Sequence, residues 1–479
     1  DSVSDSAEGI GITKYAGSNI TGMVLNALTL SLGSTGNQTL SNADISQYDN
    51  SVSSDEDIFY DVDGNDDLTV CSASGSTGCT LSVLSGNTYR PDSGSSGNIT
   101  AENLSNAGIL TLDSNTLYVS GSLTSSGTFN ANTSTVEFNG TGAQTIPTLN
   151  YYNLTSSSTG ARTLASSSTI GVANTFTPGS NSYTVTGSTM NFNGSSAQTV
   201  NAGFTYNHLQ VQPSANTVTT NFAVGSVTVS GDLTLGNGTN TGVVVNANNA
   251  STTLSVAGSV SISGNTTFQA NASNTLTIGD DFTNNGTFTH NNGTVVFNDN
   301  SKTSSLNYSA DTTFYNLSIT TAGKAMQFDE AQKTTVTHTL TITGTDCTTG
   351  RIFLDSVVDN NQWDITVTGA TVSISYADVE DANAVTTAIT ASNSTADNDN
   401  NTNWTISGGT CGGNTNPNSP ASLTQKDSGD ASITESAWTN SNTPKLGFTI
   451  TDPDSDTVKY EVQVATDSGF SSLVLDYTH

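Results

Sequence analysis

A repeat is the feature of this sequence that most constrains its fold. Residues 134–140 (STVEFNG), followed by AQTI at 143–146, return as STMNFNG at 188–194 with AQTV at 197–200, an offset of 54 residues. A shorter copy, GTVVFN, begins at Gly293, 105 residues after the start of the second copy. Each copy precedes an aromatic residue, an asparagine and a leucine, which lie within residues 152–154, 206–209 and 315–317. Recurrence at a fixed period predicts a repeat architecture.

A second recurring segment sets the length of the repeat unit. Apolar and small polar residues alternate up to a glycine at 117–121, 227–231, 254–258, 276–279 and 340–344. Alternation with a period of two is typical of β-strands, and the last four segments begin 27, 22 and 64 residues apart. The spacing indicates units of roughly 21 to 27 residues. The 54-residue repeat is too short for an immunoglobulin-type sandwich of about 100 residues, but it holds two coils of such a unit.

These patterns predict an all-β chain whose central part is a parallel β-solenoid. In this fold inward side chains stack on the same positions of neighbouring coils. The Asn-Gly pairs at 139–140 and 193–194 are expected at corners that need a positive φ, with asparagine ladders along the axis. The alternative is an antiparallel meander or serial sandwiches, in which each pair forms a type I′ hairpin turn. The residues expected in one continuous core are Val136, Phe138, Phe192, Val229, Val256, Ile278 and Phe297.

The repeats resemble a known group of proteins. Residues 105–345 are similar to the β-strand-repeat surface proteins of bacteria, which are related in style to haemagglutinin-like adhesins with β-helical shafts. Further along, DITV at 364–367, ISYADV at 374–379, TAITASNS at 387–394 and NNTNW at 400–404 resemble the last coils and the closing motif of such shafts. The resemblance implies a β-helical shaft in a protein of the cell surface.

Composition divides the chain into regions. We interpret residues 1–104, which have weaker periodicity and a dense acidic stretch, as a separate β-rich cap or head. The repeat shaft then occupies 105–407. Residues 408–419 are rich in Gly, Asn, Thr, Ser and Pro, which is a linker composition.

The last region, 420–479, resembles part of a fibronectin-III-like or other immunoglobulin-like module. Strands are expected around 446–450 and 458–464, about four or five in all, whereas a closed sandwich uses about seven. A sandwich that lacks strands exposes a sheet edge on which another strand can pair. We therefore expect the remaining strands to come from a continuation of the polypeptide or from a neighbouring copy by β-strand addition, which would produce a head-to-tail fibre.

The charge balance restricts the partners of the protein. Asp and Glu number 41 against 10 Lys and Arg, a net charge of −31, although charged residues are only 11% of the chain. Ten scattered cations cannot neutralise a phosphate backbone, and anionic lipids repel an acidic surface. No apolar run approaches the roughly 18 residues of a membrane span. We expect no nucleic-acid binding, no membrane insertion by this chain, and an extracellular location, for which the abundant Ser, Thr and Asn also argue.

Four cysteines and two acidic loops are candidate stabilising sites. The cysteines form no CxxC pair, so we expect two disulfides, Cys71 with Cys79 and Cys347 with Cys411, in place of zinc or thioredoxin-like chemistry. Calcium is the expected cofactor, because both loops place oxygen ligands at alternate positions without forming an EF-hand. A water-exposed Asp-rich turn is the alternative for each loop. The candidate ligands are Asp61, Asp63, Asn65, Asp67, Asp452, Asp454 and Asp456.

Residues that support catalysis in other β-helices form no recognisable set in this sequence. Three arginines occur, none at a repeated position, and the histidines are far apart and lack metal-ligand spacing. The paired carboxylates at 280–281 and 378–381 include adjacent residues, which face opposite sides of a strand. We therefore expect no enzymatic activity. The residues in question are Arg90, Arg162, Arg351, His208, His290, His338 and His479.

The function predicted from these features is that of an extracellular structural or adhesive protein, in which a rigid stalk serves surface attachment or display. The first alternative is a subunit of a self-assembling filament or surface layer, formed by strand exchange or end-to-end stacking. The second is a glycan-binding or polysaccharide-degrading β-helix protein. Expected partners are further copies of the chain, other cell-surface components, or glycans.

Overall fold

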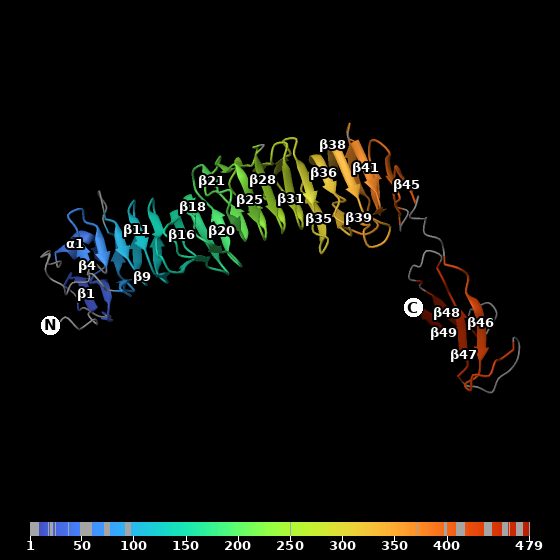
Figure 1. Cartoon of the computed structure of the whole chain (residues 1–479), viewed down its shortest axis with the longest axis horizontal. Helices are drawn as coiled ribbons and strands as arrows, with labels where there is room; N and C mark the ends of the chain where they lie inside the picture. Colours follow the sequence, from blue (N-terminus) through green and yellow to red (C-terminus); the bar gives the residue numbers. More distant parts are fainter. Residues whose placement is uncertain are drawn as a thin grey trace.

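The chain forms a long parallel β-solenoid of about 16 turns, as the sequence predicts. The computed structural model describes residues 9–17, 19, 23, 25–36, 38–47, 60–70, 77–91, 97–249, 251–369, 371–396, 400–408, 417–434, 443–452, 458, 460–465 and 473–478. Within these residues the only helix is α1 (Asn42–Ser46), capped by Ser41. Strands of successive turns lie side by side along the long axis of the solenoid (Figure 1). The antiparallel meander is therefore excluded for the repeat region.

One side of the solenoid is a sheet of 16 strands. Every neighbouring pair in it is parallel except β4 with β5, an antiparallel hairpin at its N-terminal end. In spatial order the strands are β4 (Tyr60–Val62), β5 (Leu68–Val70), β8 (Ile99–Ala101), β11 (Thr116–Val119), β14 (Thr135–Phe138), β16 (Asn150–Ser156), β18 (Thr169–Thr177), β20 (Thr189–Phe192), β23 (His208–Val211), β26 (Leu233–Leu235), β29 (Val260–Ile262), β32 (Phe282–Asn284), β35 (Thr303–Tyr308), β37 (Ala325–Phe328), β39 (Ile352–Ser356) and β42 (Ala377–Val379).

A second long sheet contains 12 strands. Its main path is β22 (Thr205–Tyr206), β25 (Gly225–Val229), β28 (Thr252–Val256), β31 (Thr275–Ile278), β34 (Thr294–Phe297), β36 (Thr312–Ile319), β38 (Thr334–Thr343), β41 (Thr371–Ser375), β44 (Ile389–Ser392) and β45 (Trp404–Ser407). Two further strands, β40 (Trp363–Val367) and β43 (Ala382–Ala384), lie off this path, where β40 pairs with β38. The two long sheets enclose the core.

Four shorter parallel sheets complete the walls of the solenoid. The first contains β1 (Gly9–Lys14), β2 (Thr29–Ser34), β6 (Thr80–Val83), β9 (Asn103–Asn106) and β12 (Leu123–Ser125). The second contains β13 (Thr128–Asn130), β10 (Ile109–Thr111), β7 (Thr88–Tyr89) and β3 (Thr39–Leu40). The third and fourth contain β15 (Gln144–Ile146), β17 (Arg162–Leu164) and β19 (Tyr183–Thr184), then β21 (Gln198–Val200), β24 (Thr219–Phe222), β27 (Val243–Asn246), β30 (Thr266–Gln269) and β33 (Thr287–Thr289).

The predicted core is confirmed. All seven residues named from the sequence are buried, with exposed fractions of 0 to 1%, and belong to one continuous apolar cluster. Alternation explains this, because inward residues of one strand stack on inward residues of the next, as Leu117, Val136 and Leu154 do. Asparagine ladders also occur, for example Asn246 donating to Asn221 at 2.9 Å and Asn174 donating to Asn153 at 2.7 Å.

The third repeat copy lies on a different sheet from the first two. Copies one and two form β14 and β20 of the 16-stranded sheet, whereas copy three forms β34 of the 12-stranded sheet. The local pairing is nevertheless the same, because Val136 lies opposite Leu154 and Val295 opposite Leu317. The repeated segment therefore encodes a pair of stacked strands, and it does not specify which side of the solenoid they occupy.

The expected reason for the Asn-Gly corners is wrong. None of the four residues at 139–140 and 193–194 has a left-handed φ. Glycine is needed there because of a close approach: a Cβ on Gly140 would lie 2.0 Å from the Ser120 carbonyl oxygen, and one on Gly194 would lie 2.1 Å from that of Ala173. Left-handed residues occur at other turns, such as Asp113 and Asn132.

The expected boundary at 104/105 falls inside the solenoid. Strand β9 spans it and pairs in parallel with β6 on one side and β12 on the other. Parallel pairing extends back to β1 and β2, so the described parts of residues 1–104 include the first turns of the shaft. The weak periodicity of this region concealed these turns, because its strands are short and widely separated in sequence.

The C-terminal region contains two antiparallel strand pairs among its described residues. Strand β46 (Ala421–Lys426) pairs with β47 (Lys445–Thr449), and β48 (Glu461–Ala465) pairs with β49 (Leu473–Thr478). Strands β47 and β48 overlap the segments predicted from the sequence. The immunoglobulin-like module stays a resemblance, because two separate pairs do not define a sandwich.

Candidate functional site

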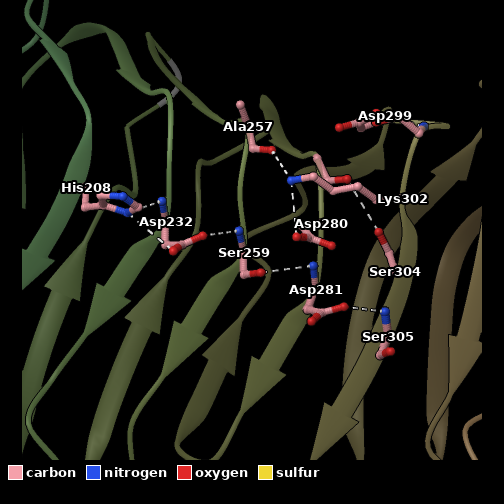
Figure 2. Close-up of polar contacts among 12 residues, drawn as sticks. His208, Asp232, Ala257, Ser259, Asp280, Asp281, Asp299, Lys302, Ser304 and Ser305 are labelled. Atoms are coloured by element: carbon pink, nitrogen blue, oxygen red, sulfur yellow. Dashed lines mark hydrogen bonds and ion pairs between the residues drawn. The ribbon is translucent and has the colours of Figure 1, made fainter. Parts of the chain in front are cut away.

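A ladder of polar side chains follows the corner at which the chain enters the 16-stranded sheet (Figure 2). It consists of His208, Asp232, Ser259, Asp281 and Ser305. Each residue directly precedes a core residue of one stacked column, which contains Leu209, Leu233, Val260, Phe282 and Leu306. The register of the sheet therefore brings five residues, which are far apart in the sequence, into one row along the shaft.

Each side chain of this ladder accepts a hydrogen bond from the backbone of the next turn. The backbone N–H of Asp232 donates to His208 Nδ1 at 3.0 Å, and that of Ser259 donates to Asp232 Oδ1 at 3.0 Å. The N–H of Asp281 donates to Ser259 Oγ at 3.4 Å, and that of Ser305 donates to Asp281 Oδ1 at 2.8 Å. The ladder thus satisfies corner N–H groups that have no place in the strand pairing.

Two lysines lie beside the ladder. Lys302 Nζ is 3.2 Å from Asp280 Oδ2 and donates to the Ala257 carbonyl at 3.4 Å (Figure 2). Lys324 is fully buried, and its ammonium donates to the carbonyls of Asp299 and Lys302 at 2.8 and 2.9 Å and to Ser304 Oγ at 2.5 Å. Burial lowers the pKa of Lys324, an effect that the neighbouring aspartates oppose. This cation therefore links two turns from inside the corner.

The opposite corner, where the chain leaves the 16-stranded sheet, is built from buried amides. Gln144 Oε1 accepts from the Gly140 N–H at 2.8 Å, and its Nε2 donates to the carbonyls of Val119 and Gly121 at 2.9 and 2.8 Å. Gln198 repeats the pattern with Gly194 in the second copy. The glutamine of the AQT motif therefore closes each corner onto the preceding turn.

Arg162 occupies the same column one turn above Gln144. Its side chain is fully buried and donates to five backbone carbonyls, with the shortest bonds to Ser157 at 2.8 Å and Phe138 at 2.9 Å. Burial lowers the pKa of this guanidinium. The expectation that no arginine lies at a repeated position was therefore wrong, because the register places Arg162 on the glutamine of the repeat.

The predicted calcium loop forms the turn of the β4–β5 hairpin. Asp63 Oδ1 accepts from the backbone N–H groups of Asn65 and Asp67 at 2.8 and 3.0 Å, and the Asp67 carboxylate accepts from the backbone and side chain of Asn98. Among the described residues no group of three or more His, Cys, Asp or Glu is arranged to hold a metal ion. Calcium binding stays a prediction, and the loop already serves as a cap of the sheet.

Several other predicted positions fall outside the described residues. In the second acidic loop Asp452 is described, whereas Asp454 and Asp456 are not. Cys71 and Cys411 are likewise outside, so the pairings of Cys79 and Cys347 stay predictions.

Two histidines that are far apart in the sequence flank one tyrosine. The rings of Tyr315 and His338 stack at 4.4 Å with an interplanar angle of 8°, and His290 lies 5.6 Å from Tyr315 on the other turn. Burial lowers the pKa of His290. His208 joins the corner ladder, and His479 lies outside the described residues. The described histidines are therefore not isolated, because stacking of turns connects them to neighbours that sequence spacing does not reveal.

The sequence contained one usable signal for the ladder. Each ladder residue stands immediately before the first apolar residue of a strand in the 16-stranded sheet. Finding the row requires the register of five strands, which the irregular spacing of 22 to 27 residues between them conceals. Lys324 carried no signal, because nothing in its local sequence indicates burial.

Comparison with known proteins gives no relative: no family model, no curated protein and no solved structure matches this chain. Among the described residues no helix is both long enough and apolar enough to cross a membrane.

Proposed function

We propose that this protein is a rigid extracellular stalk that serves attachment to, or display on, a cell surface. The observation that supports the proposal is the uninterrupted series of parallel strands from β5 to β42 in one sheet. At about 4.8 Å per strand, these 15 strands extend for about 70 Å. A structure in which each turn pairs with the next has free edges only at its ends, which suits a load-bearing spacer.

The polar groups of the corners support a structural role. The ladder side chains, Gln144, Arg162 and Lys324 all bond backbone groups of adjacent turns. Such bonds stabilise the stacking of turns and leave these groups engaged within the fold. We therefore propose that the chain is structural and not catalytic.

Small-angle scattering and imaging of single molecules test the stalk. The expected particle is a rod, and deletion of residues 135–188, one 54-residue repeat period, should shorten it by about 10 to 15 Å while parallel β structure is retained. A globular particle, or a deletion variant of unchanged length, would contradict the proposal. Antibody labelling of intact cells that express the protein tests its location, and labelling only after lysis would contradict a surface role.

End-to-end assembly is a second candidate, because the long sheet and the first short sheet each end in a strand with one pairing partner. Among the described residues β45 pairs with β44 alone, and β1 pairs with β2 alone. Terminal strands are templates for a further strand. Sedimentation over a wide concentration range tests this, with growth into multiples of one rod length as the expected result.

Calcium at the β4–β5 turn is proposed as a stabilising ligand of the shaft. Bound calcium would add stability by mass action, about 2.7 kcal/mol when its concentration is a hundred times the dissociation constant. Thermal unfolding with calcium and with a chelator tests the site, and Asp63→Ala is the matched variant. A melting temperature that the chelator leaves unchanged would remove calcium from the proposal.

A further inference from the structure

The outer face of the 12-stranded sheet contains no charged residue along its main path. Its ten strands, from β22 to β45, include no Asp, Glu, Lys or Arg, in a chain that carries 41 acidic and 10 basic residues. The 16-stranded sheet differs, since Glu137 and Asp355 lie on its outward positions and Asp232 and Asp281 line its corner. Charge is therefore excluded from one long side of the shaft.

Outward residues of this face form two straight rows of hydroxyl groups. Their inward neighbours are buried, whereas the row residues are half-buried or exposed. The first row passes through Thr205, Thr228, Ser255, Thr277, Val296, Ser318, Thr341 and Ser373. The second row contains Ser226 beside Thr253, and then Thr275, Thr294, Asn316, Thr339 and Thr371.

Strand pairing gives these hydroxyls a regular spacing in two directions. Neighbouring strands are about 4.8 Å apart, and two residues along one strand span about 6.6 Å. The pairing is parallel and in register through the turns that carry the rows, so the array is rigid before any ligand binds. The spacings are similar to the distances between oxygen atoms on the surfaces of crystalline water.

The absence of charge and the periodicity together select the ligand. A second copy of the chain would also carry a charge of −31, and two rows across eight strands cover roughly 400 Å², half of the ~800 Å² per partner in a stable interface. Sugar chains are usually held by aromatic faces, but the prominent ring beside the rows, Tyr315, is stacked against His338 at 4.4 Å. A neutral lattice of hydrogen-bonding groups needs neither.

We propose that the hydroxyl face of the 12-stranded sheet binds ice. Threonine suits this ligand because its hydroxyl continues the hydrogen-bonded lattice while its methyl group orders the adjacent water. The proposal is independent of the stalk function, since a rod without ice affinity is still a stalk.

Growth of ice from a dilute solution of the fluorescently labelled full-length chain tests the proposal, with labelled albumin as the reference protein. The central variant is Thr277→Lys, which places a long cation in the middle of the first row. Its matched control is Thr283→Lys, on β32 of the same turn, where the side chain points outward from the 16-stranded sheet between Ser261 and Asn307. Melting curves establish that both variants fold.

The expected result is that the native chain and Thr283→Lys are incorporated into the ice and slow its recrystallisation, whereas Thr277→Lys falls to the albumin level. Rejection of the native chain from ice would overturn the proposal, as would equal loss in both variants. Without ice uptake, binding to crystalline cellulose or chitin that Thr277→Lys abolishes would assign the face to a polysaccharide. A dimer that Thr277→Lys dissociates, again without ice uptake, would assign it to a second copy.

Discussion

The two long sheets of the shaft have similar interiors and different exteriors. Inside, Val136 and Phe138 of the 16-stranded sheet correspond to Val295 and Phe297 of the 12-stranded sheet, and all four are buried. Outside, one sheet carries carboxylates along its corner, whereas the other carries uncharged hydroxyls. The interior is constrained by stacking between turns, and the exterior is free to differ from side to side.

The repeat copies show the same division of constraint. Asn153 Nδ2 donates to Thr135 Oγ1 at 3.2 Å in the first copy, and Asn316 Nδ2 donates to Thr294 Oγ1 at 3.1 Å in the third, although the copies lie on different sheets. The strand pair is therefore a portable unit. What changes with its position is the chemistry of the surface around it.

Equal interiors predict equal penalties for a buried charge. Phe192→Asp in the 16-stranded sheet and Phe297→Asp in the 12-stranded sheet each place a carboxylate in the apolar core, where both phenylalanines have an exposed fraction of 0%. Each is expected to lower the free energy of unfolding by several kcal/mol, about 3 to 5, or to prevent folding. Denaturant titration measures the loss.

The conservative variants Phe192→Leu and Phe297→Leu serve as controls, with expected losses of about 1 to 2 kcal/mol. A large loss on one sheet and none on the other would show that the two interiors are not equivalent, and the comparison would then fail.

The fold could be predicted from the sequence because it depends on local alternation. Val256 and Ile278 announce buried positions through their two-residue period, and repetition makes the signal cumulative. The first turns were missed since β1 and β2 lie at widely spaced sequence positions, and their partner β6 lies 46 residues beyond β2. A period that is not constant gives no statistical signal.

The sites were harder to predict because they depend on register. Whether Arg162 is buried depends on its position above Gln144, and whether Thr277 joins a row depends on Ser255 and Val296. None of these relations is visible within a single turn. A change of one residue in a corner would move each outward side chain to the interior.

The exit corner is expected to contribute less than the core but more than the surface. Gln144→Ala leaves the Gly140 N–H and the carbonyls of Val119 and Gly121 without this partner inside the fold. Unpaired buried groups cost about 1 to 3 kcal/mol each, and relaxation reduces the sum, so a loss of about 2 to 4 kcal/mol is expected. Thr145→Ala, at the exposed neighbouring position, is the control and should change stability by less than about 0.5 kcal/mol. Equal losses in the two variants would contradict the assigned role of Gln144.

The entry corner is expected to show pH dependence through Lys324. Lys324→Met removes the ammonium that holds the carbonyls of Asp299 and Lys302, at an expected cost of about 1 to 3 kcal/mol at neutral pH. Burial lowers the pKa of Lys324 in the folded chain below its ordinary value of 10.5, so between the two values the unfolded chain binds more protons. Stability contributed by this group therefore rises with pH through that window. Unfolding titrations of both proteins up to pH 10.5 should show the native chain gaining on the variant. A difference that shrinks as pH rises would contradict the assignment.

The smallest effect is expected at the exposed end of the ladder. Asp232→Asn keeps an oxygen that accepts the Ser259 N–H, but removes the charge that lies 3.3 Å from His208 Nδ1. Both side chains are about half exposed, so solvent screens the pair and the expected cost is about 0 to 1 kcal/mol. Added salt should reduce this difference further, since the Debye length falls to about 3 Å at 1 M. Unfolding titrations at low and high salt measure it, with Asp232→Ala as the variant that also removes the acceptor and should cost more at both. If Asp232→Asn is as costly as Asp232→Ala in high salt, the carboxylate itself, and not merely its oxygen acceptor, holds the corner, and the charged exterior would then be as constrained as the core.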